Sequence, residues 1–166
     1  MRSGGSGHTG ALNTWRLAGL FPAVLTVFGD MGKAVLAIMI AERLDPSGWA
    51  VVAAGIMVLV GHCWPIFAGF RGGVGMASGI AILLYLVPVS VFILIPLWAI
   101  FVALFRHFPR SQAAIAAVTP FVLWGLRIYG VKITIPLLVF GFLAGGTIFV
   151  RHLHSIGRTT FTMGLK

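Results

Sequence analysis

Long apolar runs separated by short polar turns make up most of this chain. Each turn between the runs contains charged, glycine or proline residues. An apolar run of about 20 residues can cross the hydrocarbon core of a bilayer as an α-helix, because each residue adds about 1.5 Å of length. Several runs are shorter, so one or two helices are expected to lie partly in the interface. The pattern predicts membrane-spanning helices over residues 17–40, 49–67, 76–87, 91–104, 113–126 and 133–150.

The composition agrees with this pattern. Of the 166 residues, 59% are hydrophobic and 9% are charged, and the mean hydropathy is +1.04. A soluble domain has about a quarter of its residues charged. We therefore predict an all-α fold, a polytopic integral membrane bundle of about six transmembrane helices, formed by a single membrane-embedded domain over residues 1–166.

The charge is strongly basic, with 12 Lys and Arg residues against 3 acidic ones. Apart from Lys33, the basic residues lie outside the apolar runs, and they form no solvated basic face, so a nucleic-acid partner is not expected. Alternate loops carry eight and three basic residues, and the richer side is predicted to be cytoplasmic. The opening loop, the loop around Arg71 and the carboxyl end would then share that face. The richer side holds Arg2, Arg16, Arg71, Arg106, Arg110, Arg151, Arg158 and Lys166, and the other side Arg43, Arg127 and Lys132.

Two glycine-rich turns carry candidate chemistry. The segment Gly5–Gly10 has the spacing G-x-G-x-x-G, but too few residues precede it for the strand of a dinucleotide-binding unit. The second turn contains Gly72, Gly73 and Gly75 and follows Arg71. Glycine lets backbone N–H groups approach an anion, so both turns are candidate phosphate sites. The alternative for the second turn is a hairpin that only allows close helix packing, with Arg71 as an interfacial anchor.

Ionisable residues inside the apolar runs are further candidates. Asp30 and Lys33 are three residues apart in the first run, which predicts an ion pair with a functional or a purely structural role. Asn13 and Arg16 have the same spacing and are expected to share one face of a short helix. His62 lies in the second run and is either a site residue or a hydrogen-bonded packing histidine.

Residues 151–158 follow the last predicted span, and the last helix can continue through them. Arg151, Ser155 and Arg158 would then lie on one stripe of its surface, either as a binding site or as ordinary membrane anchors. His152 and His154 are two residues apart and would point to different sides of the helix, so a zinc site is not predicted.

Together these motifs resemble the PlsY-type acyl-phosphate:glycerol-3-phosphate acyltransferases of bacterial membranes. The family's first motif is similar to the segment from Gly5 to Arg16, and its aspartate–lysine element resembles Asp30 and Lys33. Its central signature, a Gly-His, a Phe-Pro and then Phe-x-Gly-Gly-Lys-Gly, resembles residues 61–75, and its closing segment resembles residues 152–158. The order and spacing agree along nearly the whole chain.

The resemblance implies that a fatty acyl group moves from acyl phosphate to glycerol 3-phosphate, giving lysophosphatidate and phosphate. It implies a bacterial inner-membrane enzyme with cytoplasmic active-site loops, membrane lipids as surroundings, and no metal or other cofactor. We expect a monomer. The implied catalytic residues are Ser6, Asn13 and His152, of which His152 would relay a proton or orient a phosphate. The implied substrate-binding residues are Arg16, Lys33, His62, Arg71, Gly72, Gly73, Gly75, Ser155 and Arg158.

The chain also departs from the family pattern. Val74 stands where the family has its phosphate-facing lysine, and Ser155 stands for a late asparagine. Such a lysine supplies a charge-assisted contact of about 1.5–3 kcal/mol. The helix that the family places before its first motif has no counterpart, which indicates a fragment or a misassigned start. Two alternatives stay open: an inactive relative that binds phospholipid or acyl phosphate, and a small transporter with Asp30 and Lys33 as its ion pair.

Overall fold

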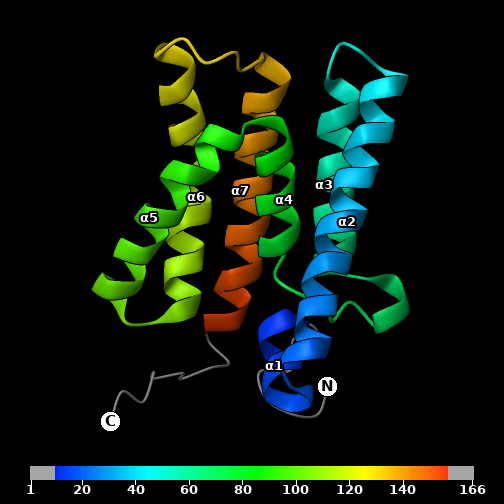
Figure 1. Cartoon of the computed structure of the whole chain (residues 1–166), viewed down its shortest axis with the longest axis vertical. Helices are drawn as coiled ribbons and strands as arrows, with labels where there is room; N and C mark the ends of the chain where they lie inside the picture. The colour runs from blue at the N-terminus through cyan, green and yellow to red at the C-terminus, as the bar shows by residue number, and fades with distance from the viewer. Residues whose placement is uncertain (1–9, 157–166) are drawn as a thin grey trace. The chain divides into compact units, whose positions relative to one another are not determined.

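The computed structural model describes residues 10–156, and for residues 154–156 it describes the backbone alone. All regular structure in this range is helical (Figure 1). The α-helices are α1 Ala11–Ala18, α2 Leu20–Leu44, α3 Trp49–Cys63, α4 Met76–Leu86, α5 Pro88–Phe105, α6 Phe108–Ile128 and α7 Ile135–Ile156, and a 3-10 turn, η1, covers Ile66–Ala68.

Among the described residues, five helical segments are long and apolar enough to cross a membrane, and α4 is a shorter apolar helix of 11 residues. The predicted all-helical membrane bundle of about six helices is therefore confirmed. The five segments are Leu20–Leu44, Trp49–Ala68, Pro88–Phe105, Phe108–Ile128 and Ile135–Leu153.

The start of the first predicted span was wrong by three residues. Leu17 and Ala18 belong to α1, and Gly19 separates α1 from α2 with φ +89°. Residues with a Cβ rarely adopt this left-handed φ, so the glycine ends one helix and redirects the chain into the next. At the other end, α7 continues past residue 150, where the last predicted span ends, to Ile156.

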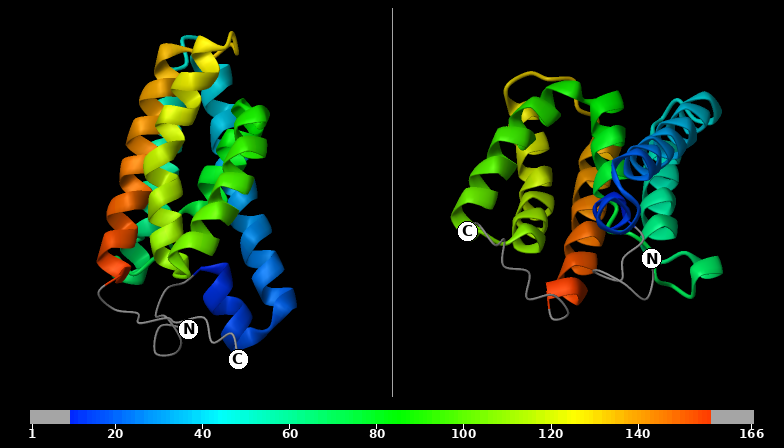
Figure 2. Two further views of the ribbon diagram at one scale, coloured as in Figure 1. Left: turned by 90° about the vertical axis from the view of Figure 1, so that its left-hand side faces the viewer. Right: turned by 60° about the horizontal axis from the view of Figure 1, so that its bottom comes forward.

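The chain forms two compact units, Met1–Ile82 and Leu83–Lys166. In the first unit α2 packs against both α1 and α3 (Figure 1). In the second unit α6 packs against both α5 and α7, and α6 and α7 run side by side in opposite directions (Figure 2). The single domain over residues 1–166 stays a prediction.

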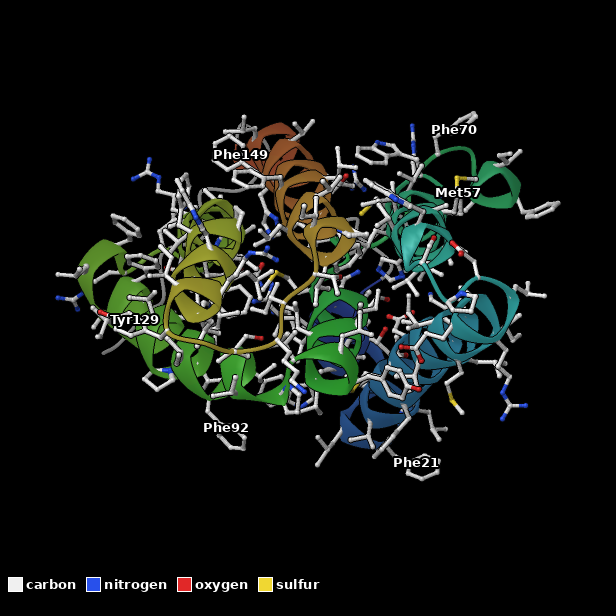
Figure 3. All side chains as sticks on the ribbon, turned by 90° about the horizontal axis from the view of Figure 1, so that it is seen from above. Phe21, Met57, Phe70, Phe92, Tyr129 and Phe149 are labelled. Atoms are coloured by element: carbon white, nitrogen blue, oxygen red, sulfur yellow. The ribbon has the colours of Figure 1, made fainter. Side chains whose placement is uncertain are left out.

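The outward faces of the helices are apolar. The side chains of Phe21 on α2 and Phe92 on α5 point away from their units and are 74% and 73% exposed (Figure 3). Met57 on α3 is also exposed. Large apolar side chains at such exposure are unfavourable in water, whereas lipid tails are as apolar as leucine. These faces fit a lipid environment.

Small residues set the distance between α6 and α7. A Cβ atom added at Gly145 would lie 2.5 Å from the carbonyl oxygen of Ala116, and one at Gly141 would lie 2.6 Å from the side chain of Leu123. The two helix backbones are therefore closer than alanine would allow. Since the helices are antiparallel, residues after Gly145 on α7 meet residues before Ala116 on α6. This register decides which polar groups meet at the carboxyl end of α7.

Candidate functional site

Three ionisable side chains meet between α2 and α3, and we call Asp30, Lys33 and His62 the charged cluster. Lys33 Nζ donates to Asp30 Oδ1 at 2.5 Å and lies 2.9 Å from His62 Nδ1. His62 Nδ1 also lies 3.2 Å from Asp30 Oδ1. The ion pair predicted from the spacing of Asp30 and Lys33 is confirmed, and α3 adds His62 to it.

The tautomer of His62 decides which hydrogen bonds the ring forms in the charged cluster. An ammonium group has only donors, so Lys33 forms a hydrogen bond with His62 Nδ1 when that nitrogen presents its lone pair. The ring proton then lies on Nε2, whereas a proton on Nδ1 would donate to Asp30 Oδ1, 3.2 Å away. The side chains of Asp30 and His62 are largely buried, at 13% and 9% exposure, whereas Lys33 is 46% exposed. Lys33 thus bridges the carboxylate and the ring.

The glycine turn folds back onto the end of α3. The N–H of Gly72 donates to the carbonyl of Cys63 at 3.2 Å, and the N–H of Gly73 donates to the carbonyl of His62 at 3.1 Å. A Cβ at Gly73 would overlap the imidazole ring of His62, and a Cβ at Gly72 would overlap the ring of Pro65. These contacts match the close-packing alternative for the turn, and the role of Gly72 and Gly73 in anion binding stays a prediction.

The residues on either side of these two glycines differ in exposure. Arg71 is exposed, and Gly75 is buried directly before α4. Two residues into α4, the Ser78 hydroxyl donates to the carbonyl of Asp30 at 3.2 Å. The turn is therefore connected to α3 by Gly73 and, through Ser78, to the α2 residue that carries the cluster's carboxylate.

The short helix α1 holds two of the predicted site residues. Asn13 is 2% exposed, whereas Arg16 is exposed on the same helix. The Thr14 hydroxyl donates to the carbonyl of Gly10 at 3.2 Å, which stabilises the first turn. Arg16 therefore lies at the surface of the first unit.

In the second unit, His152 on α7 pairs with Gln112 on α6, and we call these residues the amide–histidine pair. His152 Nε2 lies 2.7 Å from Gln112 Oε1, and its Nδ1 lies 2.8 Å from the carbonyl oxygen of Ile148. The ring is 1% exposed. A buried imidazole with both nitrogens engaged has a fixed orientation, which either a proton relay or a phosphate-orienting role requires.

Gln112 was not predicted as a site residue. The hydrophobic pattern places it in the polar turn before a span expected to begin at residue 113, whereas α6 begins at Phe108. His107 caps the helix by accepting a hydrogen bond from the N–H of Arg110, and Pro109 favours the first turn. A glutamine in the second turn of an apolar helix could have indicated a polar partner on a neighbouring helix.

Several predicted residues cannot be placed. Ser6, Arg158 and the side chain of Ser155 lie outside the described residues. Arg151, the first residue of the predicted stripe, is 9% exposed. Among the described residues, no group of three His, Cys, Asp or Glu side chains could hold a metal ion.

One carboxylate lies outside the spans, in the turn between α2 and α3. The hydroxyl of Ser47 donates to Asp45 at 2.8 Å, and the N–H of Ala50 donates to it at 2.9 Å. These hydrogen bonds hold the pKa of Asp45 below its ordinary value, because they favour the charged form. Asp45 thereby caps the start of α3.

Comparison with known proteins gives one consistent family. A family model described as glycerol-3-phosphate acyltransferase matches residues 1–161. A protein of that name from Halalkalibacterium halodurans is 46% identical over 92 residues, which are 54% of this chain and 45% of the relative. The relative from Rubrobacter xylanophilus is 36% identical over 73% of this chain and 61% of its own length. The relative from Gloeobacter violaceus is 33% identical over 95% of this chain and 77% of its own.

Solved structures show the same fold. The crystal structure of PlsY (YgiH), an integral membrane glycerol 3-phosphate acyltransferase, in its glycerol 3-phosphate form has a TM-score of 0.78 and 25% identity, covering 95% of this chain and 76% of that chain. Its lysophosphatidic acid form gives a TM-score of 0.75 at 24% identity. The chain spans about half of the Halalkalibacterium relative and about three fifths of the Rubrobacter relative.

Proposed function

Because the chain belongs to the glycerol-3-phosphate acyltransferase family, we propose that it moves a fatty acyl group from acyl phosphate to the 1-hydroxyl of glycerol 3-phosphate. The products are lysophosphatidate and inorganic phosphate. The family match over residues 1–161 carries the proposal. The solved relative in its glycerol 3-phosphate form supports the choice of acceptor.

This reaction needs positioning more than activation. Acyl phosphate is a mixed anhydride, so its carbonyl carbon is already electrophilic and phosphate is a good leaving group. The acceptor oxygen forms the new ester bond, the bond between the carbonyl carbon and the phosphate oxygen breaks, and the hydroxyl proton ends on the departing phosphate. The protein must hold two anionic head groups and orient the attacking oxygen.

The cationic and polar residues of the motifs fit these tasks. We assign phosphate binding to the exposed guanidinium groups of Arg16 and Arg71, with Lys33, His62, Gly72, Gly73, Gly75, Ser155 and Arg158 as further substrate-binding residues. Ser6 and Asn13 are assigned to orient the acceptor hydroxyl or the leaving phosphate. His152 is assigned to relay a proton or to orient a phosphate.

A donor comparison tests the proposal. The purified chain in lipid vesicles should form lysophosphatidate from acyl phosphate and glycerol 3-phosphate, and acyl-CoA should not replace acyl phosphate. Product formation from acyl-CoA alone would contradict the proposed donor. No product from either donor, with folded protein, would contradict the proposed reaction.

We place the enzyme in the bacterial inner membrane as a monomer, with its motif loops in the cytoplasm. The distribution of basic residues supports this orientation. In a Cys63→Ala background, a cysteine at Arg71 should react with a membrane-impermeant reagent added from the cytoplasmic side. A cysteine at Tyr129, which is 89% exposed in the α6–α7 loop, should react from the opposite side. Labelling of both from one side would contradict the assignment.

A second candidate function is binding without turnover, and Val74 favours it because the family has a lysine at this position. If the turn meets a phosphate, Val74→Lys should lower the KM for glycerol 3-phosphate or acyl phosphate about tenfold, since one charge-assisted contact is worth about 1.5 kcal/mol. Val74→Met is the uncharged control of similar length. An equal KM in both variants would leave the turn with a packing role only.

A further inference from the structure

The contacts of His152 determine where its ring hydrogens can lie. The carbonyl of Ile148 can only accept, so the Nδ1 atom 2.8 Å from it must carry a hydrogen. In the neutral ring, Nε2 then has a lone pair and needs a donor. The side-chain amide of Gln112 has an oxygen and an NH2 group that exchange places by a half-turn. It can therefore give a hydrogen bond to the neutral ring or accept one from the protonated ring.

The charges around the amide–histidine pair favour the neutral ring. Residues 83–166 contain no Asp and no Glu. On α7 the neighbouring residue Arg151 is cationic and buried, and on α6 Arg110 is cationic and exposed, while His107 caps that helix. On the α5 side the charged residue is Arg106, which is exposed. No Asp or Glu side chain of the second unit is therefore present to stabilise an imidazolium, and burial at 1% exposure opposes the charged form.

We propose that Gln112 is a positioning residue, which holds His152 as the neutral tautomer with hydrogen on Nδ1 and keeps the ring in its orientation for acyl transfer. The effect on catalysis rests on the proposed function, whereas the tautomer is a property of the α6–α7 pair itself. Gln112 contacts the ring at Nε2, so we assign its effect to the position of His152. The Gln112 amide satisfies a neutral Nε2 when the NH2 group takes the place of the Oε1 atom that lies 2.7 Å from the ring, and it adds no charge.

The ring nitrogens can be observed directly. In protein labelled with ¹⁵N-histidine, the His152 signals are identified by their loss in His152→Asn, because the chain has five histidines. Near pH 7 the wild type should show one hydrogen-bearing nitrogen and one with a lone pair. Gln112→Glu has the same shape but only accepts and carries a negative charge, so both His152 nitrogens should become hydrogen-bearing.

Two further variants separate positioning from a general structural effect. Gln112→Met keeps the length of the side chain and removes its hydrogen bond, so kcat should fall about tenfold while the KM for glycerol 3-phosphate stays within about twofold. Thr119→Val is the matched control on α6, since its hydroxyl bonds only the Ile115 carbonyl of the same helix, at 2.8 Å. It should leave both the ring signals and kcat unchanged.

Each measurement can overturn the inference. Two hydrogen-bearing nitrogens in the wild type would exclude the neutral tautomer. Unchanged ring signals in folded Gln112→Glu, or unchanged kcat in Gln112→Met, would show that Gln112 does not act through His152. If Gln112→Glu does not fold, the wild-type spectrum still tests the tautomer, and kcat of Gln112→Met still tests the positioning role. A wild-type chain without acyltransferase activity would overturn the proposed function, and the ring spectra would still test the tautomer.

Discussion

Each half of the chain holds a largely buried histidine between two helices, but the two histidines have partners of opposite character. His62 meets an acid and a base, Asp30 and Lys33, and its ring packs against Gly73. His152 meets a backbone carbonyl and the neutral amide of Gln112. All three acidic residues of the chain precede residue 83, so the second half has none to offer.

Because the partners differ, substitutions at the two histidine sites are expected to have different effects on stability and on turnover. Removing Asp30 or Lys33 from the charged cluster leaves the opposite charge without its ion-pair partner in a membrane span, which costs stability. Changing Gln112 in the amide–histidine pair removes one hydrogen bond and no counter-ion. We therefore expect changes in the first unit to appear mainly as lost stability, and changes in the second to appear mainly as lost turnover.

The largest effect is expected for Asp30→Asn. This change keeps the shape of the side chain but leaves the Lys33 ammonium without its counter-ion, so the free energy of unfolding should fall by about 3 kcal/mol. The free energy of unfolding can be measured by denaturant titration in mixed micelles. The double variant Asp30→Asn with Lys33→Met should lose less than the sum of the single changes. Strict additivity would show that the two charges do not depend on each other.

Gly73→Ala tests whether the glycine turn is fitted to the histidine ring. The added methyl group would overlap the His62 imidazole, which is fixed by the charged cluster, so a loss of about 2 kcal/mol is expected. Gly61→Ala on α3 is the matched control, because a Cβ there meets nothing within 4 Å. It should be neutral or stabilising by up to about 1 kcal/mol. Equal stability of the two variants would remove the packing argument.

Gly145→Ala applies the same test to the second unit, with a smaller expected loss of about 1.5 kcal/mol. The methyl group would push α7 away from the Ala116 carbonyl and lengthen the contact between His152 and Gln112, so kcat should fall as well. Gly146→Ala, where a Cβ meets nothing within 4 Å, is the control. A stability loss without any change in kcat would break the link between helix spacing and the amide–histidine pair.

Local features of the site could be predicted from the sequence, and features that depend on helix register could not. The Asp30–Lys33 pair follows from a spacing of three residues on one helix. The contact between Gln112 and His152 joins residues 40 apart, and it depends on how closely α6 and α7 approach at Gly145. Hydrophobic periodicity gives the face of a helix but not the register of its neighbour.

The glycine turn could be predicted from the sequence only in part. Its glycines indicated a backbone that can approach another group closely, and the sequence left open whether that group is a phosphate or the protein itself. The structure places the His62 ring and the Cys63 carbonyl against Gly73 and Gly72. Whether the glycines face a phosphate or the protein depends on the path of the chain after Pro65, and no local sequence pattern encodes that path.

The most direct test of the account is the rate of lysophosphatidate formation from acyl phosphate and glycerol 3-phosphate by the wild type and by His152→Ala, each normalised to folded protein. The account predicts that the wild type forms product only when both substrates are present. It also predicts that His152→Ala loses about a hundredfold in kcat, because proton transfer by a positioned side chain contributes at least about this factor. A folded wild type without product, or a variant with the wild-type kcat, would contradict it.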